Sequence, residues 1–181
     1  KEQDEVVLIG NNESQNYTVL YGRVTNTEVD SGDRHSATFK VVYGNRGGSS
    51  GSPIFNSRGD VVGIHYKGTD SSGDGLWIEY VKDALSHIQA GNTPRRGNIG
   101  CRLTLTLISE ALKNFHLPIK HAGRLRAFRE RATRMIMVAS IIPLSPAEGL
   151  LEPGDLVLAV DGAPVGNNEY RFDKAVDASI G

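Results

Sequence analysis

The sequence has a single cysteine, Cys101, among its 181 residues. One cysteine excludes an internal disulfide, and the chain also lacks the paired Cys-x-x-Cys and His-x-x-x-His spacings of metal sites, so we expect no metal. No apolar run approaches the roughly twenty residues that cross a bilayer. Lys and Arg number 20 against 21 Asp and Glu, for a net charge of −1, which argues against a dedicated nucleic-acid binder. The length suits a globular chain with one or two modest cores.

The most informative segment is a run of glycine and serine, GGSSGSP at residues 47–53. Glycine permits positive φ and lets a substrate approach the main chain closely. Acyl transfer needs a reactive hydroxyl on a tight turn, with backbone N–H groups aimed at the charge that develops on the attacked carbonyl. The run therefore predicts a nucleophilic serine, and the candidate is Ser50, between Ser49 and Ser52.

Glycine and serine clusters are more often flexible loops or hairpin turns than active sites. The surroundings of this run decide between the alternatives. Residues 37–43 (ATFKVVY) predict a strand before it, and residues 53–55 and 61–66 predict a hairpin after it. A flexible linker would not be framed by strands in this way, so we favour an ordered turn.

Residues on both sides extend the pattern. DEVVLIGNN at 4–12 and VLYGRV at 19–24 precede the run, and LWIEYVKDAL at 76–85 follows it. Together they resemble the second β-barrel of trypsin-like peptidases of the HtrA/Deg group, and the spelling GGSSGSP is closest to the tandem-repeat relatives of fungi and plants. The resemblance implies a mainly β fold with short helices, in which residues 1–90 form the second six-stranded barrel of a trypsin-like protease.

The resemblance also implies roles for individual residues. Ser50 is the expected nucleophile, and the amides of Gly48 and Ser50, helped by that of Ser49, form the expected oxyanion hole. Gly44 falls at the floor of the specificity pocket, where no acidic residue stands, so we expect a small or medium apolar residue at the cleaved position. The strand edge that pairs with an extended substrate is expected at Ile64, His65 and Tyr66.

A serine hydroxyl needs a base, and in trypsin-like enzymes the catalytic His and Asp come from the first barrel, ahead of the serine. About fifty residues precede Ser50 here, and they resemble the second barrel alone. We therefore expect a fragment whose His and Asp are absent and whose isolated chain is inactive. We interpret His35 and His65 as surface or substrate-lining side chains rather than as replacement bases. The remaining histidines carry no motif: His87, His116 and His121.

A second part of the chain begins after residue 90. Turn-forming residues at 91–97 (GNTPRRG) predict a linker between a helix at 81–89 and an alternating strand at 101–107. Residues 109–115 predict a short helix capped by Ser109, and residues 135–141 predict a strand.

Three short motifs follow in order, SPA at 145–147, PGD at 153–155 and VDG at 160–162. Such motifs are turn signals in most proteins, but their order behind a protease-like half resembles a PDZ domain of the HtrA type, in which the first starts a helix. The resemblance implies a partial PDZ domain over residues 98–181, incomplete at its C-terminus. Its carboxylate-binding loop would use the amides of Ile99, Gly100 and Cys101, although Asn98 stands where a large residue is common.

Residues 120–134 (KHAGRLRAFRERATR) form a strongly basic segment. Such a run is usually a solvated loop or helix face, and the alternative is a patch for an acidic partner.

Taken together, the resemblances imply an ATP-independent serine endopeptidase of the HtrA/Deg type in protein quality control, needing no cofactor and acting on unfolded or C-terminal peptides. Assembly into homotrimers is common in that group. The rival hypothesis is a catalytically inactive, protease-like scaffold that binds peptides. The compartment stays open: extracytoplasmic such as the periplasm, or, in a eukaryote, nuclear or organellar.

Overall fold

The computed structural model describes residues 1–14, 17–29, 37–44, 47–128 and 133–180. These residues form two compact units, the first made of 1–29 and 37–94 and the second of 95–180. The division lies between Pro94 and Arg95, inside the segment expected to be a linker.

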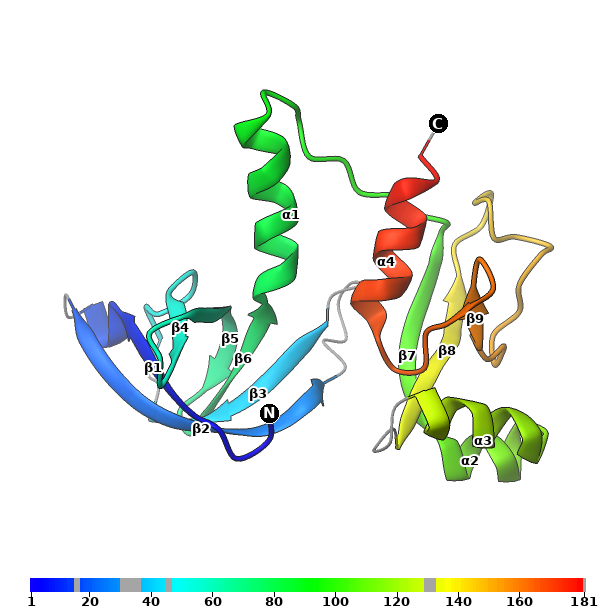
Figure 1. Cartoon of the computed structure of the whole chain (residues 1–181), viewed down its shortest axis with the longest axis horizontal. Helices are drawn as coiled ribbons and strands as arrows, with labels where there is room; N and C mark the ends of the chain where they lie inside the picture. The colour runs from blue at the N-terminus through cyan, green and yellow to red at the C-terminus, as the bar shows by residue number, and fades with distance from the viewer. Residues whose placement is uncertain (15–16, 30–36, 45–46, 129–132, 181) are drawn as a thin grey trace. The chain divides into compact units, whose positions relative to one another are not determined.

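The first unit is a closed antiparallel barrel of six strands, drawn in blue to green in Figure 1. Around the barrel the strands follow the order β1-β2-β3-β6-β5-β4, and β1 pairs with β4 to close it. This confirms the expected six-stranded barrel. The strands are β1 (Glu5–Gly10), β2 (Thr18–Val29), β3 (Thr38–Val42), β4 (Pro53–Asn56), β5 (Val61–Thr69) and β6 (Ser72–Trp77).

Alternation of side chains along the strands builds the barrel core. Val6 and Leu8 of β1 and Phe39 and Val41 of β3 point inward, where Ile54 of β4 meets them. Because successive side chains of a strand face opposite sides, the residues between them, Val7 and Lys40, point outward, where they are partly exposed. Each fully buried side chain of this size stabilises the fold by roughly 1.5–3 kcal/mol.

Helix α1 (Ile78–Gln89) follows β6 directly. It begins three residues before the predicted start at residue 81, because Tyr80 is buried against the barrel and its hydroxyl accepts a hydrogen bond from the Ala37 amide at 3.0 Å. The helix thus holds the start of β3 in place.

The second unit combines two small antiparallel sheets with three helices. In Figure 1 they run from green to red. The elements are β7 (Cys101–Leu107), α2 (Ile108–Asn114), α3 (Ile119–Phe128), β8 (Arg134–Ile141), β9 (Ala159–Val160), β10 (Ala163–Pro164) and α4 (Glu169–Ala178). None of the described helices is both long and apolar enough to cross a membrane.

Two hydrophobic clusters organise this unit. One joins β7 and β8 to α4 through side chains such as Leu103, Val138 and Phe172. The other lies under α2 and α3, around Ile108 and Met135. The sheet of β7 and β8 therefore has α4 packed against it and the other two helices at its end.

Two local predictions for this unit were wrong. Helix α2 begins at Ile108, so Ser109 lies inside it and cannot be its cap; the buried Ile108 instead bonds its amide to the Thr133 carbonyl at 2.9 Å, directly after the strand. The SPA motif starts no helix. Residues 145–150 form successive turns, with Gly149 at a φ of 76°, a left-handed conformation that ends helical propagation.

Candidate active site

The glycine-serine run forms the turn between β3 and β4. Gly48 and Gly51 have φ values of 86° and 88°, in the region that side chains rarely adopt. Of the three serines, Ser50 is exposed, whereas Ser49 is fully buried. Ser52 is partly buried, and its side chain lies against Gly10, where a Cβ would come within 2.0 Å of Oγ. The accessible hydroxyl of the turn is thus that of Ser50.

The turn is fastened to the barrel through the main chain of His65. The Gly51 amide donates to the His65 carbonyl, and the His65 amide donates to the Ser52 carbonyl, both at 2.8 Å. Within the turn, the Ser52 amide donates to the Ser49 carbonyl at 3.0 Å. Strand β5 therefore fixes the two residues that directly follow Ser50.

The amides expected to form the oxyanion hole donate no hydrogen bond within the described part of the chain. This holds for Gly48, Ser49 and Ser50, whereas the neighbouring Gly51 and Ser52 amides are both bonded. Two or more unbonded amides beside an exposed hydroxyl can stabilise a developing oxyanion. The turn thus has the components that acyl transfer requires, apart from a base.

No imidazole of the described residues is hydrogen-bonded to Ser50. His35 lies outside the described residues. The expectation that His65 is a surface side chain was wrong, because only 2% of the residue is exposed. Its Nδ1 lies 2.6 Å from the hydroxyl of the buried Tyr43, so this ring belongs to the barrel interior.

The environment of His65 is a buried polar cluster that the sequence analysis did not identify. Burial lowers the pKa of His65, and the carboxylate of Asp74 opposes this; burial likewise raises the pKa of Tyr43 well above its usual range. Asp74 is buried and pairs with Lys40 at 3.4 Å. Gly73 makes room for the pair, because a Cβ there would lie 2.5 Å from the Tyr43 hydroxyl. The neutral imidazole is the favoured form.

The residues expected to line the substrate site lie on β5 and shortly after β3. Ile64 pairs with Pro53 of β4 and with Leu76 of β6, while Tyr66 is partly exposed on β5. Gly44 is exposed, and a Cβ placed on it would meet no atom within 4 Å. Beyond His65, β5 pairs with β6 alone among the described strands.

The predicted carboxylate-binding loop lies at the start of β7. Ile99 is partly buried, Gly100 is buried with a φ of 79°, and Cys101 is the first, buried residue of the strand. The Gly100 amide is already engaged, because it donates to the Asn98 side-chain oxygen at 2.7 Å. Burial raises the pKa of the Cys101 thiol, which favours its unreactive protonated form.

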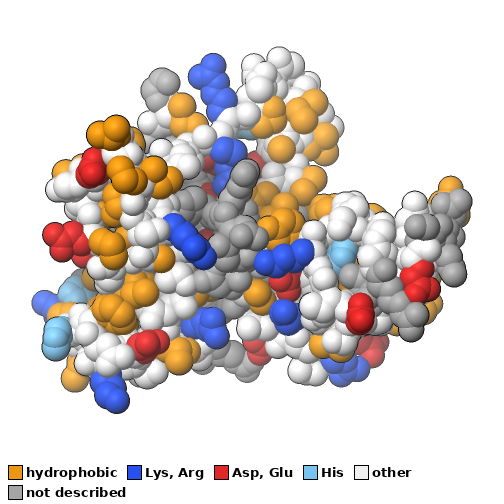
Figure 2. All heavy atoms as spheres, turned by 180° about the vertical axis from the view of Figure 1, so that it is seen from behind, with side chains coloured by type: hydrophobic (Ala, Val, Ile, Leu, Met, Phe, Trp, Pro, Cys, Tyr) orange, Lys and Arg blue, Asp and Glu red, His pale blue; other side chains and the backbone are white. Residues whose placement is uncertain are grey.

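The basic segment spans α3 and the residues up to β8, and residues 129–132 of it lie outside the described residues. On the face drawn in Figure 2, Lys and Arg side chains are interspersed with Asp and Glu.

Comparison with known proteins gives matches for both halves of the chain. Residues 1–64 match the family model of the trypsin-like peptidase domain. Among curated relatives, the pro-apoptotic serine protease Nma111 of Meyerozyma guilliermondii is 23% identical over 187 residues, and that of Aspergillus clavatus is 29% identical over 191 residues. Both alignments cover 98% of this chain but only 19% and 18% of the relatives, so the chain spans about a fifth of their length.

Solved structures show the same fold. The HtrA-type protease AlgW with a decapeptide has a TM-score of 0.60 at 20% identity, covering 99% of this chain and 54% of AlgW. AlgW with a tripeptide has a TM-score of 0.59 at 20% identity, covering 97% of this chain and 56% of AlgW. Together, these matches agree with the resemblance seen in the sequence: residues 1–64 match the trypsin-like peptidase domain, nearly the whole chain is similar in sequence to the Nma111 serine proteases, and its fold is shared with AlgW.

Proposed function

We propose that this chain carries the nucleophile of an HtrA-type serine endopeptidase. The observation that supports the proposal most strongly is the exposed Ser50 on a glycine turn whose Gly48 and Ser50 amides donate to no described acceptor. In the proposed reaction the Ser50 oxygen attacks a peptide carbonyl while a base takes the hydroxyl proton. The carbonyl oxygen becomes an oxyanion, which the two amides stabilise in the tetrahedral intermediate.

The substrate is proposed to bind as an added strand along β5. Strand β4 ends its pairing with β5 at Ile64, and the next residue bonds to the nucleophile turn itself. An extended peptide placed beyond this point, at Tyr66, would continue the sheet and bring a carbonyl towards Ser50. The uncharged, open position at Gly44 supports a preference for small or medium apolar residues at the cleaved position.

The general base is proposed to come from a histidine outside this 181-residue chain, oriented by an aspartate. His65 is excluded as the base, since its ring is buried and bonded to Tyr43. We therefore expect the isolated 181-residue chain to give no peptidase turnover.

The test is cleavage of an unfolded polypeptide by the native protein and by its Ser50→Ala and Ser52→Ala variants. We expect the first variant to lose turnover and the second to retain it, provided both keep the wild-type unfolding midpoint. Turnover that survives Ser50→Ala would overturn the proposal. A native protein without any turnover would favour the alternative, an inactive protease-like scaffold that binds peptides.

The second unit is proposed to be a PDZ-type peptide-binding module. The Val138 amide donates to the Asp155 carbonyl, and the Val138 carbonyl accepts from the Gly154 amide, so both groups point away from β7. In an antiparallel ladder, two facing residues exchange either both of their main-chain hydrogen bonds or none. Leu103, which faces Val138, therefore directs its own N–H and C=O away from β8. Ile136 and Leu105 repeat this arrangement.

The edge of β7 that faces away from β8 has no further strand among the described residues, so its main-chain groups suit an added peptide strand. AlgW, which shares the fold, was solved with peptides. We propose that the two units act together in protein quality control, on unfolded polypeptides and in a homotrimer. Sedimentation of the native protein tests the assembly.

A further inference from the structure

The Gly100 amide, in the expected carboxylate-binding loop before β7, is occupied by a side chain of the same loop. Asn98 Oδ1 accepts the Gly100 N–H at 2.7 Å. The Gly100 carbonyl is also engaged, accepting from the Ile142 amide at 2.7 Å and from the Ser145 hydroxyl at 3.1 Å. Ser145 packs so closely on Gly100 that a Cβ there would lie 2.0 Å from the serine Cβ. Gly100 therefore has little freedom to turn its amide towards a ligand.

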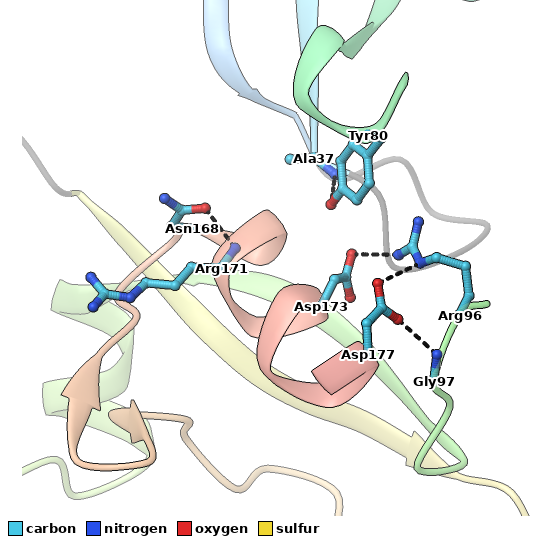
Figure 3. A network of polar contacts seen from close by, with 8 residues as sticks. All are labelled: Ala37, Tyr80, Arg96, Gly97, Asn168, Arg171, Asp173 and Asp177. Atoms are coloured by element: carbon cyan, nitrogen blue, oxygen red, sulfur yellow. Dashed lines mark hydrogen bonds and ion pairs between the residues drawn. The ribbon is translucent and has the colours of Figure 1, made fainter. Parts of the chain in front are cut away.

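The charge beside this loop is unfavourable for an anion. The Arg96 guanidinium pairs with Asp173 at 3.1 Å and with Asp177 at 3.2 Å, as Figure 3 shows. Asp177 also accepts the Gly97 amide at 2.7 Å. One guanidinium facing two carboxylates leaves these three groups with a net charge of −1. By themselves, these three groups would repel a peptide carboxylate rather than attract it.

The charged side chain at the start of β7 faces away from the core of this unit. Arg102 is exposed and lies between the buried Cys101 and Leu103, so its side chain points to the opposite face of β7. The buried side chains face the cluster that includes Phe172 and Val176 of α4. The main-chain edge of β7 at Leu103 and Leu105 is the recognition element that remains.

We propose, resting on the peptide-binding function proposed above, that the second unit takes internal extended segments of polypeptides rather than free C-termini. An internal segment needs the main-chain edge of β7 but brings no charge to the loop. A C-terminal carboxylate must displace the Asn98 side chain and approach two aspartates. An amide hydrogen bond to a charged group contributes about 1.5–3 kcal/mol, so freeing the Gly100 amide should favour the carboxylate by about tenfold or more.

The experiment measures the binding of three fluorescent peptides to the 181-residue chain. They share one valine- and threonine-rich decapeptide, which ends in a free carboxylate, in a carboxamide, or continues into a Gly-Ser-Gly-Ser extension. For the wild type we expect the carboxamide and the extended peptide to bind with similar dissociation constants, and the free acid to bind at least about threefold more weakly. Asn98→Ala should tighten binding of the free acid about tenfold and leave the other two peptides unchanged. The matched control Asn98→Asp keeps the acceptor and should weaken the free acid further.

Two outcomes overturn parts of the account separately. Binding of the free acid to the wild type as tight as, or tighter than, that of the carboxamide refutes the inference while leaving peptide binding intact. Failure of all three peptides to bind a folded chain refutes the peptide-binding function itself. Since Asn98 is exposed, its variants are expected to keep the wild-type circular dichroism spectrum, which shows that the chain is folded.

Discussion

Replacing Tyr43 by phenylalanine tests the buried cluster behind the nucleophile turn. The change keeps the ring but removes the hydroxyl that lies 2.6 Å from His65 Nδ1. The imidazole nitrogen loses this partner in a site where both residues are buried. Leaving a buried polar group without its partner costs about 1–3 kcal/mol. With a urea m-value of about 1–3 kcal/mol/M, the unfolding midpoint should fall by about 1 M.

The assay is urea unfolding followed by tryptophan fluorescence. The sequence has one tryptophan, Trp77, and it packs against the barrel core, so its signal reports on the first unit. Tyr21→Phe is the matched control, because Tyr21 is 79% exposed on the barrel, and its free energy of unfolding should change by less than about 0.5 kcal/mol. A Tyr43→Phe midpoint equal to that of the control would refute the assigned hydrogen bond.

Three further predictions concern stability. Burial lowers the pKa of His65, so the folded barrel binds fewer protons than the unfolded chain. The stability of the barrel should therefore be full above about pH 6.5 and decline as the pH falls through the lowered pKa of the folded state. His65→Gln should flatten this dependence in urea titrations across that pH range. Gly73→Ala should destabilise the barrel by about 1–3 kcal/mol, because a Cβ would meet the Tyr43 hydroxyl at 2.5 Å; an unchanged fluorescence midpoint would contradict this. Arg96→Ala removes a cation that pairs with the buried Asp173. Since Arg96 is about half exposed, the free energy of unfolding followed by circular dichroism should fall by about 1–2 kcal/mol, whereas Arg95→Ala, at an exposed neighbour, should change it little.

The barrel could be predicted from the sequence because its signals are local. Alternating apolar residues marked β1 and β3, and the glycine-serine run marked the turn between two strands. Family resemblance then supplied the closed six-stranded arrangement, since pairing between distant strands leaves no mark in the spacing of residues. The exposed Ser50 and the unbonded amides beside it are consistent with the predicted nucleophile turn.

Other features depend on contacts between residues far apart in the sequence. Tyr43, His65 and Asp74 lie at the end of β3, on β5 and on β6, and only the closed barrel brings them together. The inward position of His65 had no sequence signal, because Val62 and Ile64 on the opposite face of β5 are the apolar residues and His65 shares its face with Gly63. The bond between Asn98 and Gly100 is local, and an asparagine two residues before a glycine is a recognisable turn signal.

The most direct test of the central claim is labelling of the native protein with a fluorophosphonate, followed by mass spectrometry of the peptide that contains residues 47–53. Activated serines react with this reagent, so the adduct identifies which hydroxyl is paired with a base. The account predicts one adduct, on Ser50, which is lost in Ser50→Ala and retained in Ser52→Ala. An adduct on the buried Ser49 or on Ser52, or no adduct in protein that cleaves polypeptides, would contradict it.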